Sequence, residues 1–168
     1  MNTSLVLTVL GPDRPGLVGN IADTVSLHGG SWQESRMARL SGHFAGILRV
    51  ECPIENRAAL EDDLANLKSN GLLVTVAHED GDVETTGPLV FIDITGHDEP
   101  GIVKRIASTF ARLGVNVEEL TTSLESAPMA GHLLFCTRGK VSLPDGLEMS
   151  QLVEALEQVG SDLTVDIH

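Results

Sequence analysis

The sequence has few aromatic residues and no tyrosine. Four phenylalanines and one tryptophan make up 3% of its 168 residues, whereas hydrophobic residues together make up 42%. The core must therefore be built from aliphatic side chains, which suits thin layers of sheet and helix. The length fits one medium domain or two small domains of about 80 residues each.

Cysteine is scarce as well. Cys52 and Cys136 lie far apart and form no CxxC motif, and no two histidines have the H-x-x-x-H spacing. Zinc ligation and redox chemistry usually need such closely spaced groups. We therefore expect free thiols in a reducing compartment, with no metal site and no cofactor.

Long hydrophobic runs and basic residues are also lacking. No stretch approaches the roughly 18 consecutive apolar residues that a membrane span needs, and no basic region precedes the first apolar run. We therefore expect a cytoplasmic protein without a signal peptide. The net charge is −13, with six Lys and Arg against ten Asp and Glu up to residue 80, and five against fourteen beyond it. Neither half has the basic surface that nucleic-acid binding demands, so we expect no direct contact with nucleic acid.

What the sequence does contain is an internal repeat. Residues 8–50 align without a gap with residues 93–135, and fourteen of the 43 pairs are identical, whereas composition alone would give about three. The matches form two clusters. The first runs from Gly11/Gly96 to Thr24/Thr109, and the second comprises Ala45/Ala130, Gly46/Gly131 and Leu48/Leu133. We therefore expect two copies of one module.

Each copy has the pattern strand, helix, strand, strand, helix, strand. The expected strands are 5–10, 31–41, 43–51 and 71–77 in the first copy, and 89–95, 116–125, 129–137 and 162–167 in the second. This order predicts the ferredoxin-like α+β fold, an antiparallel four-stranded sheet with two helices on one face. A polar segment with Gly and Pro lies between the copies. We therefore expect domains at 1–79 and 89–168, joined by a linker at 80–88.

The turn after the first strand of each copy is the most informative segment. It reads GPDRPGLV from Gly11 and GHDEPGIV from Gly96. We expect these two glycines to permit a backbone bend, the proline to lie in the first helical turn, and Asp13 and Asp98 to cap the helix N-terminus. Free N–H groups at that end favour an anionic ligand group such as a carboxylate. The same residues would also make a good turn that binds nothing, so both interpretations stay open.

The [DN]-x-P-G-[ILV] loop, the helix after it and the sequence Gly-Val-Asn-Val at 114–117 resemble the ACT domain, an amino-acid-sensing module of metabolic regulators. The tandem arrangement is similar to the glycine cleavage system transcriptional repressor family. The resemblance implies a ligand site formed by the first loop and the start of the second strand, usually between two modules. It gives these ligand-binding candidates: Gly11, Asp13, Pro15, Gly16 and Ser31 in the first copy, and Gly96, Asp98, Pro100, Gly101 and Asn116 in the second.

Some of these positions depart from the family pattern. Ser31 stands where the second copy has Asn116, and many amino-acid-binding members carry Asn where this chain has Asp in the loop. An Asp accepts a hydrogen bond from an ammonium group but repels a carboxylate, so the ligand's orientation stays open. We add His97 as a ligand-binding candidate, because histidine changes its charge near neutral pH. We assign Trp32, expected beside the first loop, to packing.

The resemblance implies a non-enzymatic regulatory protein. It would sense a small metabolite, such as the amino acid glycine, modulate a transcriptional activator of amino-acid metabolism, and form a homodimer through its ACT modules. One alternative is a ligand-independent protein-interaction module. A second is a small acylphosphatase-like hydrolase, for which Arg14 would cradle an anion, although Glu99 takes its place in the second copy.

Overall fold

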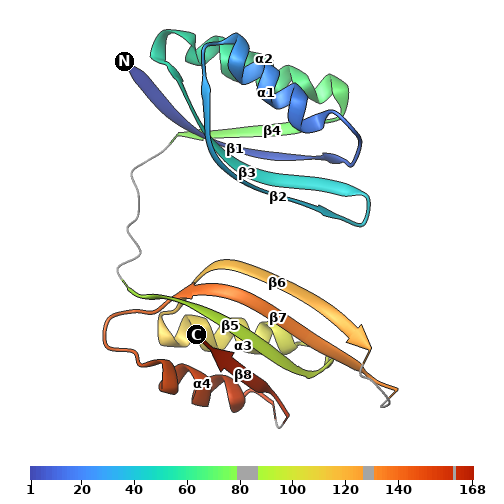
Figure 1. Ribbon diagram of the computed structural model, residues 1–168, viewed down its shortest axis with the longest axis vertical. Helices are drawn as coiled ribbons and strands as arrows, with labels where there is room; N and C mark the ends of the chain where they lie inside the picture. The colour runs from blue at the N-terminus through green and yellow to red at the C-terminus, as the bar shows by residue number, and fades with distance from the viewer. Residues whose placement is uncertain (79–86, 127–130, 161) are drawn as a thin grey trace. The chain divides into compact units, whose positions relative to one another are not determined.

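The chain divides into two compact units (Figure 1). The structure is a computed structural model that describes residues 1–78, 87–126, 131–160 and 162–168. Its two units are Met1–Asp82 and Val83–His168, called unit 1 and unit 2 below. Of the predicted linker at 80–88, only Gly87 and Pro88 are among the described residues.

Unit 1 is an antiparallel sheet with the strand order β2-β3-β1-β4. Its helices α1 and α2 cover the same face of that sheet (Figure 1). The elements are β1 (Asn2–Pro12), α1 (Leu17–Leu27), β2 (Ser31–Leu40), β3 (His43–Pro53), the short 3-10 helix η1 (Ile54–Asn56), α2 (Arg57–Asn66), a second 3-10 helix η2 (Leu67–Asn70) and β4 (Leu73–His78).

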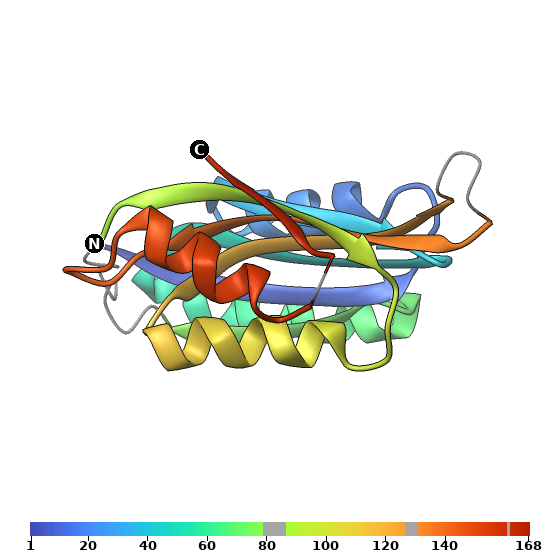
Figure 2. The same ribbon diagram turned by 90° about the horizontal axis from the view of Figure 1, so that it is seen from below.

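Unit 2 repeats the arrangement, with the strand order β6-β7-β5-β8. Figure 2 shows its two helices side by side across one face of the sheet. The elements are β5 (Leu89–His97), α3 (Ile102–Leu113), β6 (Asn116–Ser126), β7 (Leu133–Ser142), α4 (Met149–Glu157) and β8 (Thr164–Ile167). The predicted α+β fold is therefore confirmed in both units.

Each unit has its own aliphatic core between sheet and helices. In β1 the buried residues Leu5, Leu7 and Val9 alternate with more exposed ones, as expected for a strand with one buried face. In α1 the buried residues Leu17, Ile21 and Val25 recur every four positions, which forms one helical stripe. The buried residues of β1 and of α1 therefore face each other in one core. As the scarcity of aromatic residues predicts, this core consists largely of Leu, Ile and Val.

The second cluster of repeat matches does not reflect structural equivalence. Gly11 and Gly96 are equivalent positions 85 residues apart, but they lie opposite Phe44 and Phe135, which are 91 residues apart. The β6–β7 hairpin is therefore six residues longer than the β2–β3 hairpin. Gly46 lies within β3, whereas Gly131 precedes β7 with a positive φ of 66°. Our gapless alignment was therefore wrong beyond the second strand of each copy.

The thiol of Cys52 is sealed in the core of unit 1. The residue is 1% exposed, and burial, followed by the negative charge of Glu61, raises its pKa above 9.0. A raised pKa means that the folded state keeps the thiol proton while the unfolded state loses it. This stabilising difference is complete below pH 9.0 and disappears as the pH rises through the folded-state pKa.

We therefore expect the melting temperature of the protein to fall more steeply above pH 9.0 than that of the Cys52→Ala variant. Thermal unfolding followed by circular dichroism across pH 7 to 11 measures the difference. The Cys136→Ala variant is the control, because Cys136 is only partly buried. Parallel pH profiles for the wild type and Cys52→Ala would show that the Cys52 proton is not linked to folding.

Candidate functional site

The Pro-Gly pair of each loop forms a turn before the helix. Gly16 has φ 92° and ψ −4°, and Gly101 has φ 84° and ψ 8°, which are the angles of the third residue of a type II turn. In unit 2 the N–H of Ile102 donates to the carbonyl of Glu99 at 3.2 Å, which closes that turn. The glycines at these positions are needed because a Cβ strains a backbone with positive φ.

This geometry corrects two expectations about the loops. The helices begin at Leu17 and Ile102, so Pro15 and Pro100 precede the first helical turn instead of lying in it. The N-cap residues are Gly16 and Gly101, with no side-chain capping hydrogen bond, so neither aspartate is the cap. The type II turn supplies the chain reversal between strand and helix.

Gly11 and Gly96 serve close packing and not a bend. Both lie inside strands, and neither has a positive φ. A Cβ on Gly11 would lie 2.7 Å from the carbonyl oxygen of Gly71, and one on Gly96 would lie 2.4 Å from a methyl group of Leu163. The repeated glycine therefore lets the segment before the last strand cross closely over the first strand of each unit.

The two loop aspartates have different surroundings. In unit 1 the Asp13 carboxylate forms a 2.6 Å ion pair with the guanidinium of Arg39. Leu124 takes the place of Arg39 in β6, at the same spacing of 85 residues. Within the part of unit 2 that the structure describes, the Asp98 carboxylate has no ion-pair partner. In the described part of unit 2, no cation pairs with Asp98 as Arg39 pairs with Asp13 in unit 1.

His97 ends β5 beside the loop and does not lie within it. Its Nδ1 is hydrogen-bonded to the carboxylate of Asp162, and its ring lies against that of His132 with 4.2 Å between the ring centres. These contacts tie the end of β5 to the segments before β7 and β8. The role of His97 as a ligand-binding residue stays a prediction.

A hollow of about 460 Å³ lies beside the loop of unit 2. The loop and the first turn of α3 form one wall, and the second half of β6 forms the other. Its lining residues are Asp98, Glu99, Pro100, Gly101, Ile102, Val103, Thr122, Ser123, Leu124 and Phe135. The structure thus brings three predicted site residues, Asp98, Pro100 and Gly101, into one concave surface.

The sheet contributes four lining residues that the sequence reasoning missed, namely Thr122, Ser123, Leu124 and Phe135. The replacement of Arg39 by Leu124 at equivalent positions was a readable sign that the two loops differ. Phe135 could not be found in this way, because its equivalent, Phe44, is displaced by the longer hairpin.

Asn116 and Ser31 lie far from the loop of their own unit. Asn116 begins β6, opposite Ser142, and is six residues from Thr122 in the hollow. At about 3.3 Å per strand residue, this separation is roughly 20 Å. Ser31 likewise lies opposite Glu51 at the start of β2. No single unit can therefore combine these residues with its own loop in one small-molecule site, and their joint role across two modules stays a prediction.

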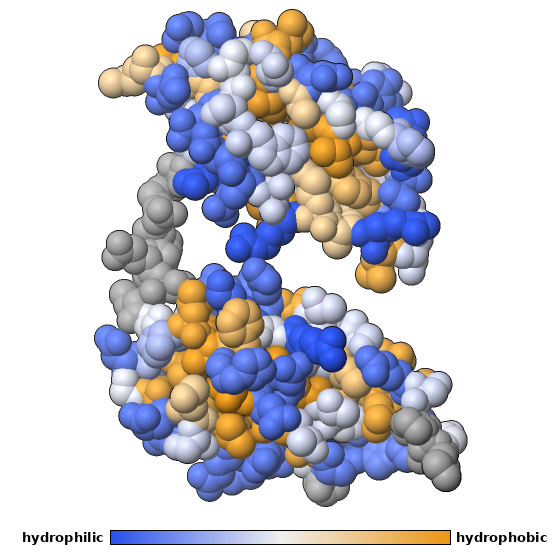
Figure 3. Space-filling model, viewed as in Figure 1, coloured by the Kyte–Doolittle hydropathy of each residue, from blue (hydrophilic) through white to orange (hydrophobic). Residues whose placement is uncertain are grey.

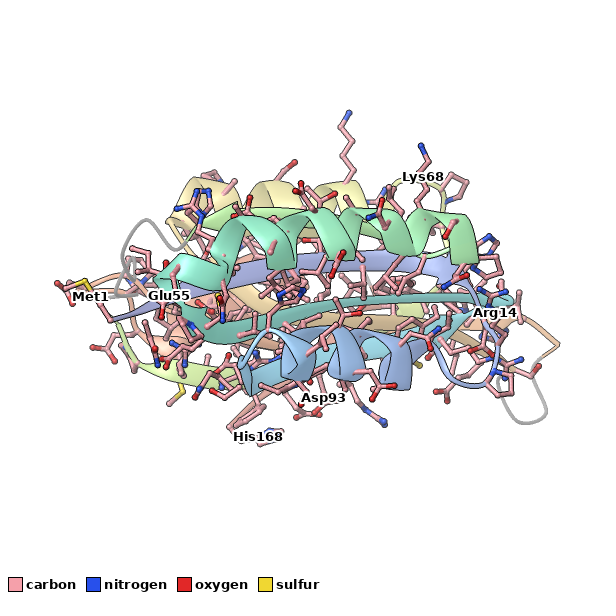
Figure 4. All side chains as sticks on the ribbon, turned by 90° about the horizontal axis from the view of Figure 1, so that it is seen from above. Met1, Arg14, Glu55, Lys68, Asp93 and His168 are labelled. Carbon is pink, nitrogen blue, oxygen red and sulfur yellow. The ribbon has the colours of Figure 1, made fainter. Side chains whose placement is uncertain are left out.

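Trp32 is also remote from the first loop, contrary to our expectation. It lies opposite Val50 and packs against the core of unit 1, so its assignment to packing is confirmed. Figure 4 shows Arg14 of the loop at one end of the unit, with Met1 and Glu55 at the other end, where β2 begins and β3 ends.

A second, smaller space adjoins the hollow. It holds about 40 Å³ between α3 and the sheet, and its accessible lining is apolar. Val103, Thr122 and Phe135 line both spaces. We call this space the α3–β6 crevice. Its floor includes Thr137, which is 2% exposed and whose hydroxyl has no hydrogen-bond partner among the described residues.

We expect Thr137→Val to raise the free energy of unfolding by about 1 kcal/mol, because it replaces an unsatisfied buried hydroxyl by a methyl group of similar size. Urea unfolding followed by circular dichroism measures the change. Thr109→Val is the matched control, because the Thr109 hydroxyl is buried but donates to the Arg105 carbonyl at 3.1 Å. That control should lower stability by about 1 kcal/mol. Equal losses in both variants would mean that the Thr137 hydroxyl is satisfied.

The described residues contain no cluster of three or more His, Cys, Asp or Glu side chains able to hold a metal ion. Of the helices in the described ranges, none is both long enough and apolar enough to cross a membrane.

Known proteins resemble this chain in sequence and in fold. The glycine cleavage system transcriptional repressors of Escherichia coli K12 and Shigella flexneri are each 28% identical to it over 126 residues. The match covers 73% of this chain and 66% of the length of each repressor. A crystal structure of an unknown protein from Galdieria sulphuraria superposes with a TM-score of 0.83 at 28% identity, covering 100% of this chain and 98% of that one.

A further crystal structure, of a putative glycine cleavage system transcriptional repressor, has a TM-score of 0.72 at 19% identity and covers 100% of this chain and 97% of that chain. At this identity it supports the fold alone. Both units match one family, the ACT domain, over residues 3–77 and 89–168. These ranges comprise nearly all of both sheets and their helices, so the chain belongs to the ACT domain family.

Proposed function

We propose that this protein is a non-enzymatic regulator that senses a small amino acid through its second ACT module and modulates a transcriptional activator of amino-acid metabolism. The observation that carries the proposal is the hollow of unit 2, with the Asp98 carboxylate at its wall. The repressors that resemble this chain support the regulatory half of the proposal.

The hollow suits both charged groups of an amino acid. The Asp98 carboxylate can accept hydrogen bonds from an ammonium group. The first helical hydrogen bond of α3 runs from the Arg105 N–H to the Gly101 carbonyl at 3.1 Å. The preceding N–H groups, those of Val103 and Lys104, therefore have no acceptor within the helix. They lie at the positive end of the helix dipole and can donate to a carboxylate.

Unit 1 is less suited to this role. Arg39 neutralises Asp13 at 2.6 Å, so an ammonium group would have to displace a guanidinium. The regulator would therefore respond to its ligand through unit 2. A ligand shifts the protein's interactions only if it binds one state better than the other, so the activator should bind the ligand-bound and ligand-free forms unequally.

Calorimetric titration of the full chain with each of the twenty amino acids tests the proposal. We expect at least one to bind, and Asp98→Ala to weaken that binding about ten- to hundredfold, because the charged acceptor of the ammonium group is lost. Asp13→Ala is the matched control in unit 1 and should leave the affinity unchanged. Absence of binding by every amino acid would refute the sensing role.

A further inference from the structure

Hydrophobic side chains remain at the surface of unit 2 among hydrophilic ones (Figure 3). Partly exposed hydrophobic side chains also line the α3–β6 crevice. Val103 of α3 is 46% exposed, and Val117 and Leu120 of β6 are 40% and 42% exposed. Between them lie the buried side chains of Phe110 and Thr137. The crevice is thus an apolar recess whose floor is buried and whose rim is open to solvent.

The same region is filled in unit 1. Met37 lies opposite Gly46 in the sheet, and its Cγ is 2.6 Å from the point that a Cβ on Gly46 would occupy. The equivalent pair in unit 2 is Thr122 opposite Thr137. A long side chain over a glycine has therefore been replaced by two short side chains. Trp32, which packs on the core of unit 1, is likewise replaced by Val117.

The crevice has the size of a small side chain. A group the size of a water molecule needs about 10–15 Å³. The 40 Å³ of the crevice therefore hold roughly three groups of that size. The side chain of valine has three carbon atoms and fits this space. Glycine would leave the crevice empty, and a phenylalanine ring exceeds its volume. The crevice also opens beside the hollow that contains Asp98, since Val103, Thr122 and Phe135 line both.

We propose that the α3–β6 crevice is a side-chain pocket of the ligand site in unit 2, and that the preferred ligand is an α-amino acid with a short branched aliphatic side chain and not glycine. This inference rests on the proposed amino-acid-sensing function. The ammonium group lies at Asp98, the carboxylate at the start of α3, and the aliphatic side chain enters the crevice. Burial of three carbon atoms favours valine over glycine by about 10- to 50-fold.

Calorimetric titration of the full chain with valine, glycine and phenylalanine provides the test, with Thr122→Met as the decisive variant. This substitution copies Met37 of unit 1 and fills the crevice without touching the buried core, since Thr122 is exposed. We expect it to abolish the preference, so that valine binds no more tightly than glycine. Thr121→Met is the matched control, because successive strand residues point to opposite faces of the sheet, and it should preserve the preference.

The outcomes separate this inference from the proposed function. If glycine binds as tightly as valine and Thr122→Met changes neither affinity, the side-chain pocket is refuted while amino-acid sensing stands. If no amino acid binds, both fail. If valine does not bind and Thr122→Met instead alters the sedimentation coefficient, the crevice is a contact between protein chains and the inference is overturned. Chemical-shift changes in α3 and β6 that appear with valine but not with glycine would support it independently.

Discussion

Phe110→Ala is expected to lower the free energy of unfolding of unit 2 by about 3–5 kcal/mol. Phe110 is 3% exposed and packs in the core between α3 and the sheet. Truncation removes most of its apolar contacts and leaves a cavity beneath the α3–β6 crevice. The neighbours on that side are half-exposed and cannot collapse fully into the space. Among the residues of a core with so few aromatics, Phe110 should therefore be especially sensitive.

Hydrogen exchange of the β5–β8 amides, followed by mass spectrometry, measures this loss in unit 2 itself. Phe91→Ala is the matched control, because Phe91 is 53% exposed on β5 and stacks on His168, with 6.1 Å between the ring centres. It should cost less than about 1 kcal/mol. Similar losses of unfolding free energy in the two variants would mean that Phe110 is not a packed core residue.

Gly11→Ala is expected to destabilise unit 1 by about 1–3 kcal/mol, although the substitution adds a single methyl group. The new Cβ would lie 2.7 Å from the Gly71 carbonyl oxygen and 3.3 Å from the Leu72 side chain. A backbone carbonyl cannot move away as a flexible side chain can. The strand or the segment before β4 must therefore shift, which disturbs the pairing of β1 with β4.

Gly19→Ala is the control for Gly11→Ala. Gly19 lies in α1 without a positive φ, and apart from its chain neighbours and the backbone of its own helix, no described heavy atom lies within 4 Å of the point that a Cβ on Gly19 would occupy. Alanine is the better helix former, so this variant should gain about 0.5–1 kcal/mol. Chemical unfolding followed by circular dichroism compares both variants with the wild type. Two gains of similar size would show that Gly11 is not held by close packing.

Much of the architecture was readable from the sequence. The repeat at a spacing of 85 residues predicted two modules, and the alternation and helical periodicity around residues such as Leu7 and Ile21 predicted the elements. These predictions succeed because each strand or helix must present its apolar residues to one core, which imposes a period on the sequence. The negative charge and the scarcity of aromatic residues pointed to the aliphatic cores and away from nucleic acid.

The candidate site was only partly readable. The sequence identified the loop of Asp98 as a candidate but assigned it a cap that Gly101 provides. It grouped Asn116 with a loop that lies at the other end of the strand, because distance along a strand is not visible in a motif. It also aligned Gly46 with Gly131 across a hairpin that differs by six residues in the two units. Identical residues in the two copies did not reveal that the pairing of the strands is shifted between the units.

The sequence by itself thus determined that the chain forms two aliphatic α+β modules with a turn between the first strand and the first helix of each, because periodicity and turn chemistry are local properties. Only the tertiary structure decided which loop aspartate is paired with an arginine and which unit has an unfilled crevice between helix and sheet. Those properties depend on residues that come together across strands, such as Asp13 with Arg39 and Met37 with Gly46. Pairing across a sheet is set by register, and register is a property of the folded chain.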